Sequence, residues 1–181
     1  MKNIVRLRAT ACAAITVGAF VLAALLSTPA EVRGAGGPVP GDSFVLLLKG
    51  IYEPVVRGPN LGLSLVDLND GSYSKCDIYR VSGLPGTTDQ AVGTFWVNFD
   101  VTLCAYLLPG GAFSAVVTEF LSELVEIDGE LYQIGTAELV IPEATGIYRS
   151  FVGGAIHMEF VTHMIDEVTF DEHCFCFISR S

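Results

Sequence analysis

The sequence predicts a single all-β domain: one antiparallel barrel of roughly eight strands that follows an N-terminal signal peptide. Residues 155–164 alternate between apolar and polar side chains, which is typical of a strand with one buried face. Turn signals recur about every 10–15 residues, and no long helical pattern stands out. The pair Gly153-Gly154 permits a sharp bend just before that strand, because glycine lacks a Cβ atom. A sheet curved this strongly most simply closes into a barrel.

The first thirty residues are expected to be a secretory signal peptide. A basic start precedes an apolar run from Ala9 to Leu26, and small residues at Thr28 and Ala30 favour cleavage after Ala30. The alternative is an uncleaved anchor, since the run is long for a signal but short for a membrane span. Residues 31–43, rich in glycine and proline, are predicted to be a flexible leader, and residues 44–181 the barrel domain. The expected location is secreted or periplasmic.

Net charge and cysteine content fit an exported protein. The whole chain carries a formal charge of −10; loss of Lys2, Arg6 and Arg8 with the signal peptide moves it to −13. Such a surface repels phosphate backbones, which argues against a nucleic-acid partner. Outside the signal peptide no apolar stretch is long enough to span a bilayer. Four of the five cysteines lie in the mature chain, and disulfides persist outside the cell, so these four are expected to be bridged: Cys76, Cys104, Cys174 and Cys176.

Cys174 and Cys176 are two apart on a predicted strand, so their side chains should share a face. A bond between them would strain the backbone, and at least one is expected to reach Cys76 or Cys104. The connectivity stays open.

Strands are predicted by apolar runs, by alternation and by the turns that close them. They are expected at Phe44–Lys49 (buried on both sides), Leu61–Leu68, Tyr73–Val81, 92–108, Ala112–Val117, Glu130–Ile141, a short segment after Gly146, 155–164 and His173–Ile178. Residues 50–60 and 82–90 are expected to be loops. Hairpin turns are predicted at Asn69-Asp70-Gly71 and Asp128-Gly129. Residues 112–126 also fit a helical stripe; we favour a strand through Val117, followed by an irregular or helical turn.

One segment resembles a known family. The motif T-G-I-Y-R-S-F-V-G-G, preceded by G-T-A-E-L-V-I, resembles the late-strand signature of the allene oxide cyclase and dirigent-like barrels. There a G-T-G-x-[YF] turn leads through a short strand to a glycine and a long barrel strand. Thr145-Gly146-Ile147-Tyr148 and Gly153 stand at the matching places, with Ala144 in place of the first glycine.

The resemblance implies a calycin-like barrel with an apolar cavity, and it leaves a homo-oligomer open. Cyclases of this kind act on an oxylipin epoxide, whereas dirigent proteins steer the coupling of phenoxy radicals. The acidic and asparagine motif near the cyclase first strand has no counterpart in residues 44–62, where Glu53 is the nearest acid. Catalytic residues therefore do not carry over, and a fold alone does not define a function.

Two groups of polar residues were weighed as sites. His157, Glu159 and His163 share a strand face, and His173 lies near two cysteines. His157 and His163 are roughly 20 Å apart on an extended strand, so a polar outer face explains them better than a metal site. We predict no metal and no cofactor.

The second group is Trp96, Asn98, Asp100 and Tyr106. If it faces the lumen, the aromatic rings could stack a flat ligand and Asp100 could be a buried acid. We favour the opposite orientation, in which the row that begins with Phe95 and Val97 fills the core and Asp100 is solvated.

Tyr148 and Arg149 could orient an anionic ligand at one barrel end, but we favour a role in capping the core. The ligand-binding candidates are Trp96, Asn98, Tyr106, Tyr148 and His157. No hydrolase elbow, zinc-protease, Walker or dinucleotide motif occurs in the sequence.

Three hypotheses of function follow. The leading one is a dirigent-like barrel that holds a small apolar or phenolic molecule in its lumen. The second is an isomerase or cyclase that uses Asp100 or Glu53 as its acid. The third is a structural or partner-binding module, which predicts a lumen filled by side chains and an exposed apolar patch elsewhere.

Overall fold

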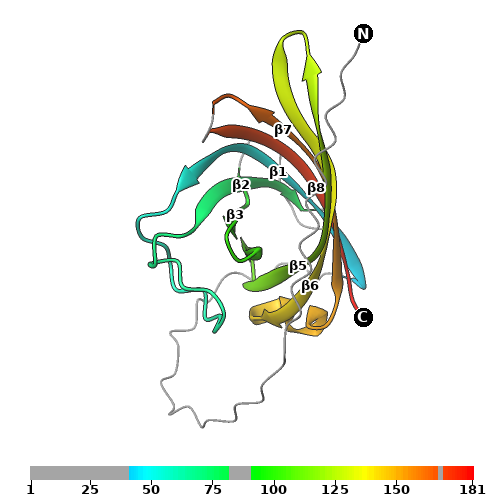
Figure 1. Cartoon of the computed structure of the whole chain (residues 1–181). Coiled ribbons are helices and arrows are strands. Elements are labelled where there is room, and N and C mark those ends of the chain that lie inside the picture. The colour runs from blue at the N-terminus through cyan, green and yellow to red at the C-terminus, as the bar shows by residue number, and fades with distance from the viewer. Residues whose placement is uncertain (1–40, 82–90, 167–168) are drawn as a thin grey trace.

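The computed structural model describes residues 41–81, 91–166 and 169–181. Its elements follow in chain order: β1 (Ser43–Pro54), β2 (Ser74–Val81), β3 (Gly93–Asn98), β4 (Leu103–Leu108), β5 (Gly111–Ile127), β6 (Glu130–Ala144), the 3₁₀ helix η1 (Gly146–Phe151), β7 (Ala155–Met164) and β8 (Phe170–Ser179). Each strand pairs antiparallel with the next, and β1 pairs with β8, so the sheet closes into an eight-stranded barrel (Figure 1). The predicted fold class is confirmed. The predicted signal peptide and the loop at 82–90 lie outside the described residues.

Side chains alternate between the lumen and the outer surface, as the sequence predicted for β7. Ile156, Met158 and Phe160 are buried, whereas Val161 on the opposite face is 42 % exposed. In β1 the same alternation corrects the expectation of two buried faces. Phe44, Leu46 and Leu48 fill the lumen, while the residues between them are only half-buried, because a barrel this small has a single core.

The lumen is closed at one end by η1, which replaces the short strand expected after Gly146. Tyr148 and Phe151 of η1 are fully buried and pack on Phe44, at ring-centroid distances of 5.7 and 5.1 Å. Gly146 has φ +58°, and a Cβ atom there would collide with the Gly110 carbonyl oxygen. Only glycine therefore allows the chain to turn closely enough to place this plug.

Residues 61–68 do not form the predicted strand, and Asn69-Asp70-Gly71 does not join two paired strands. The chain from Val55 to Tyr73 instead crosses the outer surface, where its apolar side chains cover Trp96 in a second cluster. Glu143 holds this segment, since its carboxylate accepts hydrogen bonds from the Ser64 and Leu65 backbone N–H groups at 2.8 and 2.7 Å. The predicted loop at 50–60 begins only after β1 ends at Pro54.

The single strand expected over residues 92–108 is two strands, β3 and β4, joined by a turn at residues 99–102. Phe99 and Val101, expected in the core row, are 55 and 59 % exposed. Thr102 adopts φ +55°, a conformation that non-glycine residues favour only in turns. The turn changes which alternate positions face inward, so Cys104, Tyr106 and Leu108 point into the lumen.

Residues 112–126 belong to β5, so the irregular or helical turn expected after Val117 is absent. β5 and β6 form a hairpin that projects beyond the barrel at the end opposite η1 (Figure 1). Its turn is the predicted Asp128-Gly129, with φ +54° and +88°, as two-residue hairpin turns require. Pro142 does not end β6, which continues to Ala144.

Candidate functional site

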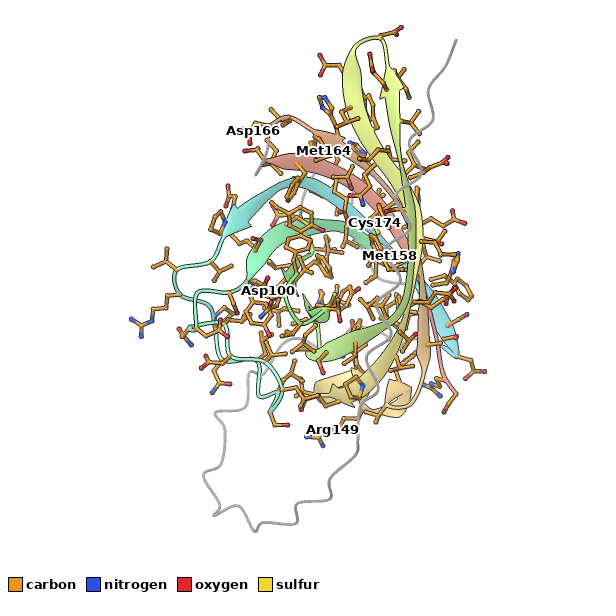
Figure 2. All side chains as sticks on the ribbon, in the orientation of Figure 1. Asp100, Arg149, Met158, Met164, Asp166 and Cys174 are labelled. Carbon is orange, nitrogen blue, oxygen red and sulfur yellow. The ribbon has the colours of Figure 1, made fainter. Side chains whose placement is uncertain are left out.

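The upper half of the barrel encloses a cavity of about 300 Å³ that opens at the end opposite η1. Cys104 and Met158 are among the residues that line it. Met158 and Cys174 mark the inner wall formed by β7 and β8 (Figure 2). Below the cavity the lumen is filled by side chains, mainly Tyr106, Phe113 and the η1 plug. The barrel is therefore a cup with a packed base rather than an open tube.

Six aromatic side chains line the cavity among mainly aliphatic neighbours. Tyr52, Phe99 and Phe170 meet edge to face near the rim, with centroid distances of 5.6, 6.1 and 6.0 Å. Phe120 from the projecting hairpin stacks on Phe160 at 5.4 Å. Phe95 completes the set. These side chains come from six strands or turns, so closure of the barrel is what brings them together.

Glu172 is the one carboxylic acid that lines the cavity among the described residues. It lies on β8, and its side chain points inward with 8 % of the residue exposed. Thr162 Oγ1 lies 3.5 Å from its Oε2, and the Tyr52 hydroxyl and Cys174 thiol also hydrogen-bond to it. Burial disfavours the charged form and raises the pKa of Glu172 to about 7, although these hydrogen bonds act in the opposite direction.

The expected disulfides are wrong: Cys76, Cys104, Cys174 and Cys176 are free thiols buried in the lumen. Cys174 and Cys176 do share a face, as predicted, with their Sγ atoms 3.7 Å apart. That separation far exceeds the ~2.05 Å of a disulfide bond. Burial raises the pKa of both Cys76 and Cys104 well above the ordinary thiol value. They therefore remain protonated and act as small apolar side chains rather than nucleophiles.

Two of the predicted ligand-binding residues, Tyr106 and Tyr148, lie in the lumen but below the cavity. Tyr106 is fully buried and stacks on Phe113 at 4.6 Å. Its hydroxyl has no oxygen or nitrogen partner among the described residues and faces the Cys176 thiol. Tyr148 donates a hydrogen bond to the Pro109 carbonyl at 3.1 Å. Tyr148 thus caps the core, as favoured from the sequence, while Arg149 points away from the barrel (Figure 2).

The remaining candidates lie outside the cavity. Trp96 is covered by the segment 55–73 on the outer surface, and Asn98 Nδ2 donates a hydrogen bond to Ser72 Oγ at 2.7 Å. Asp100 is exposed in the β3–β4 turn, and the exposed Glu53 forms an ion pair with Lys75 at 2.9 Å. The outward orientation favoured for Trp96 and Asp100 is therefore confirmed, and neither predicted acid reaches the lumen.

His157 also faces outward, where its Nδ1 atom lies 2.5 Å from Glu138 Oε1. The hydrogen bond with Glu138 raises the pKa of His157, with a smaller contribution from Glu159. His157 is thus part of a surface ion pair instead of a ligand site. Across the three described ranges, no three histidine, cysteine or acidic side chains are placed to share a metal ion.

Sequence reasoning missed Glu172, although a signal for it existed. The last predicted strand began at His173, three residues after the start of β8 at Phe170. Cys174 and Cys176 were placed on one face, and strand side chains alternate, so an extension to Glu172 puts its carboxylate on that face too. Because the predicted strand started at His173, it left out Glu172, the buried acid of this strand.

A second, open hollow of about 750 Å³ lies on the outer surface of β5–β8. Its apolar members include Leu121, Val161 and Phe175, which are 59, 42 and 56 % exposed. An exposed apolar surface of this kind is what the partner-binding hypothesis predicted, whereas the empty upper lumen is not.

No helix in the described part of the chain has the length and apolar character needed to cross a bilayer. The chain matches no protein-family model, no curated protein and no solved structure. Only the geometry and chemistry of the molecule itself therefore bear on its function.

Proposed function

We propose that this protein is an exported, dirigent-like barrel that binds a small apolar or aromatic molecule in the upper lumen. The observation that carries the proposal is the cavity of about 300 Å³ with aromatic walls and one buried carboxyl group. Its volume falls at the lower end of the range for small-molecule sites, roughly 300–1,000 Å³, and such sites combine an apolar lining with few polar groups.

The test is binding of a panel of lipids and phenols, measured by native mass spectrometry and isothermal titration calorimetry. Tryptophan fluorescence is a poor reporter, because Trp96 lies outside the lumen. Ala137 lines the cavity, so Ala137→Phe should fill it and weaken binding by at least ~10-fold. Ala155 is exposed on the outer face of β7 and supplies the matched control, Ala155→Phe. Failure of the whole panel, or equal binding by Ala137→Phe, would overturn the proposal.

A second candidate function is an isomerase or cyclase, as in the allene oxide cyclase-like alternative. In this candidate the acid is Glu172 rather than Asp100 or Glu53. A carboxyl group whose pKa is about 7 can both accept and donate a proton near neutral pH. Phenylacetone in D₂O provides a test, since its acidic C–H bonds exchange when a base removes a proton. Wild-type protein should accelerate exchange seen by NMR and Glu172→Gln should not. Equal rates would remove this candidate.

A further inference from the structure

We infer that the ligand of the lumen is a small organic amine, whose ammonium group pairs with the Glu172 carboxylate while its apolar body packs among the surrounding rings. This inference rests on the proposed binding function and narrows it to one chemical class. Three observations support it: Glu172 is buried in the cavity wall, the groups next to it are neutral, and aromatic rings lie at the rim.

Among the described residues, Glu172 has hydrogen-bond donors around it but no cation in the cavity lining. The titratable and polar groups that face it are Tyr52 on β1, Cys76 on β2, Cys104 on β4, Thr162 on β7 and Cys174 on β8. All five are neutral near pH 7, and no lysine, arginine or histidine belongs to the described cavity lining. A buried carboxylate is costly unless a positive charge pairs with it. A ligand ammonium group would supply the missing partner.

The rings above Glu172 suit a cation as well as an apolar body. Tyr52 hydrogen-bonds to the carboxylate and also belongs to the edge-to-face cluster with Phe99 and Phe170. The face of an aromatic ring carries partial negative charge, so rings that surround a cation stabilise it. An anionic ligand such as a fatty acid would instead meet the Glu172 carboxylate without a cation to offset the repulsion.

The negative charge of the whole molecule also favours a cationic ligand. The formal charge is −10, and the tip of the β5–β6 hairpin, which projects at the open end, carries Glu126, Asp128 and Glu130 without a basic residue between them. A negative potential at the entrance raises the local concentration of cations and speeds their association.

Protonation of Glu172 supports the assignment. In the empty protein burial raises the pKa of this carboxyl group to about 7, so it is largely charged only above neutral pH. A bound ammonium group favours the charged form and lowers that pKa. Amine binding near pH 7 should therefore release a proton from Glu172, and apparent affinity should rise between pH 6 and pH 8.

The experiment compares three probes of matched shape by isothermal titration calorimetry at pH 8: 2-phenylethylamine, 2-phenylethanol and ethylbenzene. Wild-type protein should bind the amine at least ~10-fold more tightly than either neutral probe, since hydrogen bonds to charged groups and cation–π contacts each contribute on this scale. Glu172→Gln should abolish the preference and the rise with pH. Asp171→Asn, one residue away and not in the cavity lining, should preserve both.

The outcomes separate this inference from the proposed function. If the neutral probes bind as tightly as the amine, or if Glu172→Gln keeps the preference, the amine assignment is wrong and the binding function stands. If lipids or phenols bind but the amine does not, the assignment is equally wrong. If nothing binds, both proposals fail. Should Glu172→Gln not fold, the selectivity of the wild-type protein among the three probes still decides the question.

Discussion

At the scale of single residues, Glu172 links the candidate site to the stability of the fold. Its pKa is about 7 in the folded protein, against a reference value of 4.5 for the exposed group, so the folded state holds this proton more tightly than the unfolded chain does. The group therefore contributes fully to stability below pH ~4.5, and that contribution is lost as the pH rises through 7. The charged form of Glu172 therefore lowers the stability of the folded protein above neutral pH.

Replacement of Glu172 by Gln should make this cost visible. Between pH 4.5 and pH 8, the free energy of unfolding of the wild-type protein should fall relative to that of Glu172→Gln, by about 3 kcal/mol in total, because a pKa unit corresponds to about 1.4 kcal/mol. Urea denaturation followed by circular dichroism at several pH values measures the difference. Parallel pH profiles for the two proteins would show that the carboxyl group is not buried as described.

The sequence was least informative at this scale. Asp100, Glu53 and His157 were chosen because their residue types suit chemistry, yet Asp100 and Glu53 are exposed and His157 is half-buried on the outer face. Whether an acid is buried depends on which way a strand faces after its last turn, and the turn at residues 99–102 changed that orientation between Trp96 and Tyr106. Alternation predicts which residues of a strand share a face, but it does not say which of the two faces points into the barrel.

At the scale of elements, the η1 plug depends on a glycine that the sequence did identify. Gly146→Ala should destabilise the fold by about 2–4 kcal/mol, because the new methyl group meets the Gly110 carbonyl oxygen and the backbone has positive φ. Gly71 also has positive φ, +79°, but open space around it. Gly71→Ala should therefore cost only about 1 kcal/mol.

Chemical denaturation measures the free energy of unfolding of both alanine variants. The difference between their losses gives the cost of the contact with the Gly110 carbonyl, because both variants share the strain of a positive φ. Similar losses in both would mean that the close approach of η1 to the β4–β5 turn contributes little.

A strong local signal predicted an element only where distant contacts did not override it. Asp128-Gly129 forms the predicted hairpin turn, whereas Asp70-Gly71, the same pair of residues, does not join two paired strands. Residues 61–68 have strand-like composition, but Glu143, far away in the chain, holds Ser64 and Leu65 in an irregular path. The helical stripe of residues 112–126 was misleading for a related reason: β5 contains two register shifts, which disturb simple alternation.

At the scale of the whole molecule, barrel closure buries four thiols and so shields them from reagents in solution. Native protein should leave Cys76, Cys104, Cys174 and Cys176 unmodified by iodoacetamide, whereas protein in urea should be alkylated at all four. Peptide mass spectrometry after digestion measures the labelling of each residue. A cross-linked peptide containing two of these cysteines would contradict the free-thiol arrangement and restore the disulfides that the sequence suggested.

The overall architecture was the most predictable feature, since closure needs only enough strands, short connections and a bend. The strand total agreed in part because errors compensated. Residues 61–68 and the segment after Gly146 do not form strands, while 92–108 supplied two strands rather than one. The cavity could not be predicted, because it depends on how far side chains such as Tyr106 and Phe113 fill the lumen.

The unequal lengths of β4 and β5 have a consequence for how copies of this protein behave together. β4 pairs with β5 only as far as Val116, so over residues 119–127 the described part of the chain pairs with β5 on the β6 side alone. The unpaired N–H and C=O groups of this edge could hydrogen-bond to a strand of another molecule. Glu119, Glu123 and Glu126 oppose such pairing, because the same negative charges on two copies repel each other. Replacement of these three glutamates by neutral residues would remove the repulsion and favour edge-to-edge association between copies along β5, so the unequal strand lengths make these acidic side chains part of what keeps the copies apart.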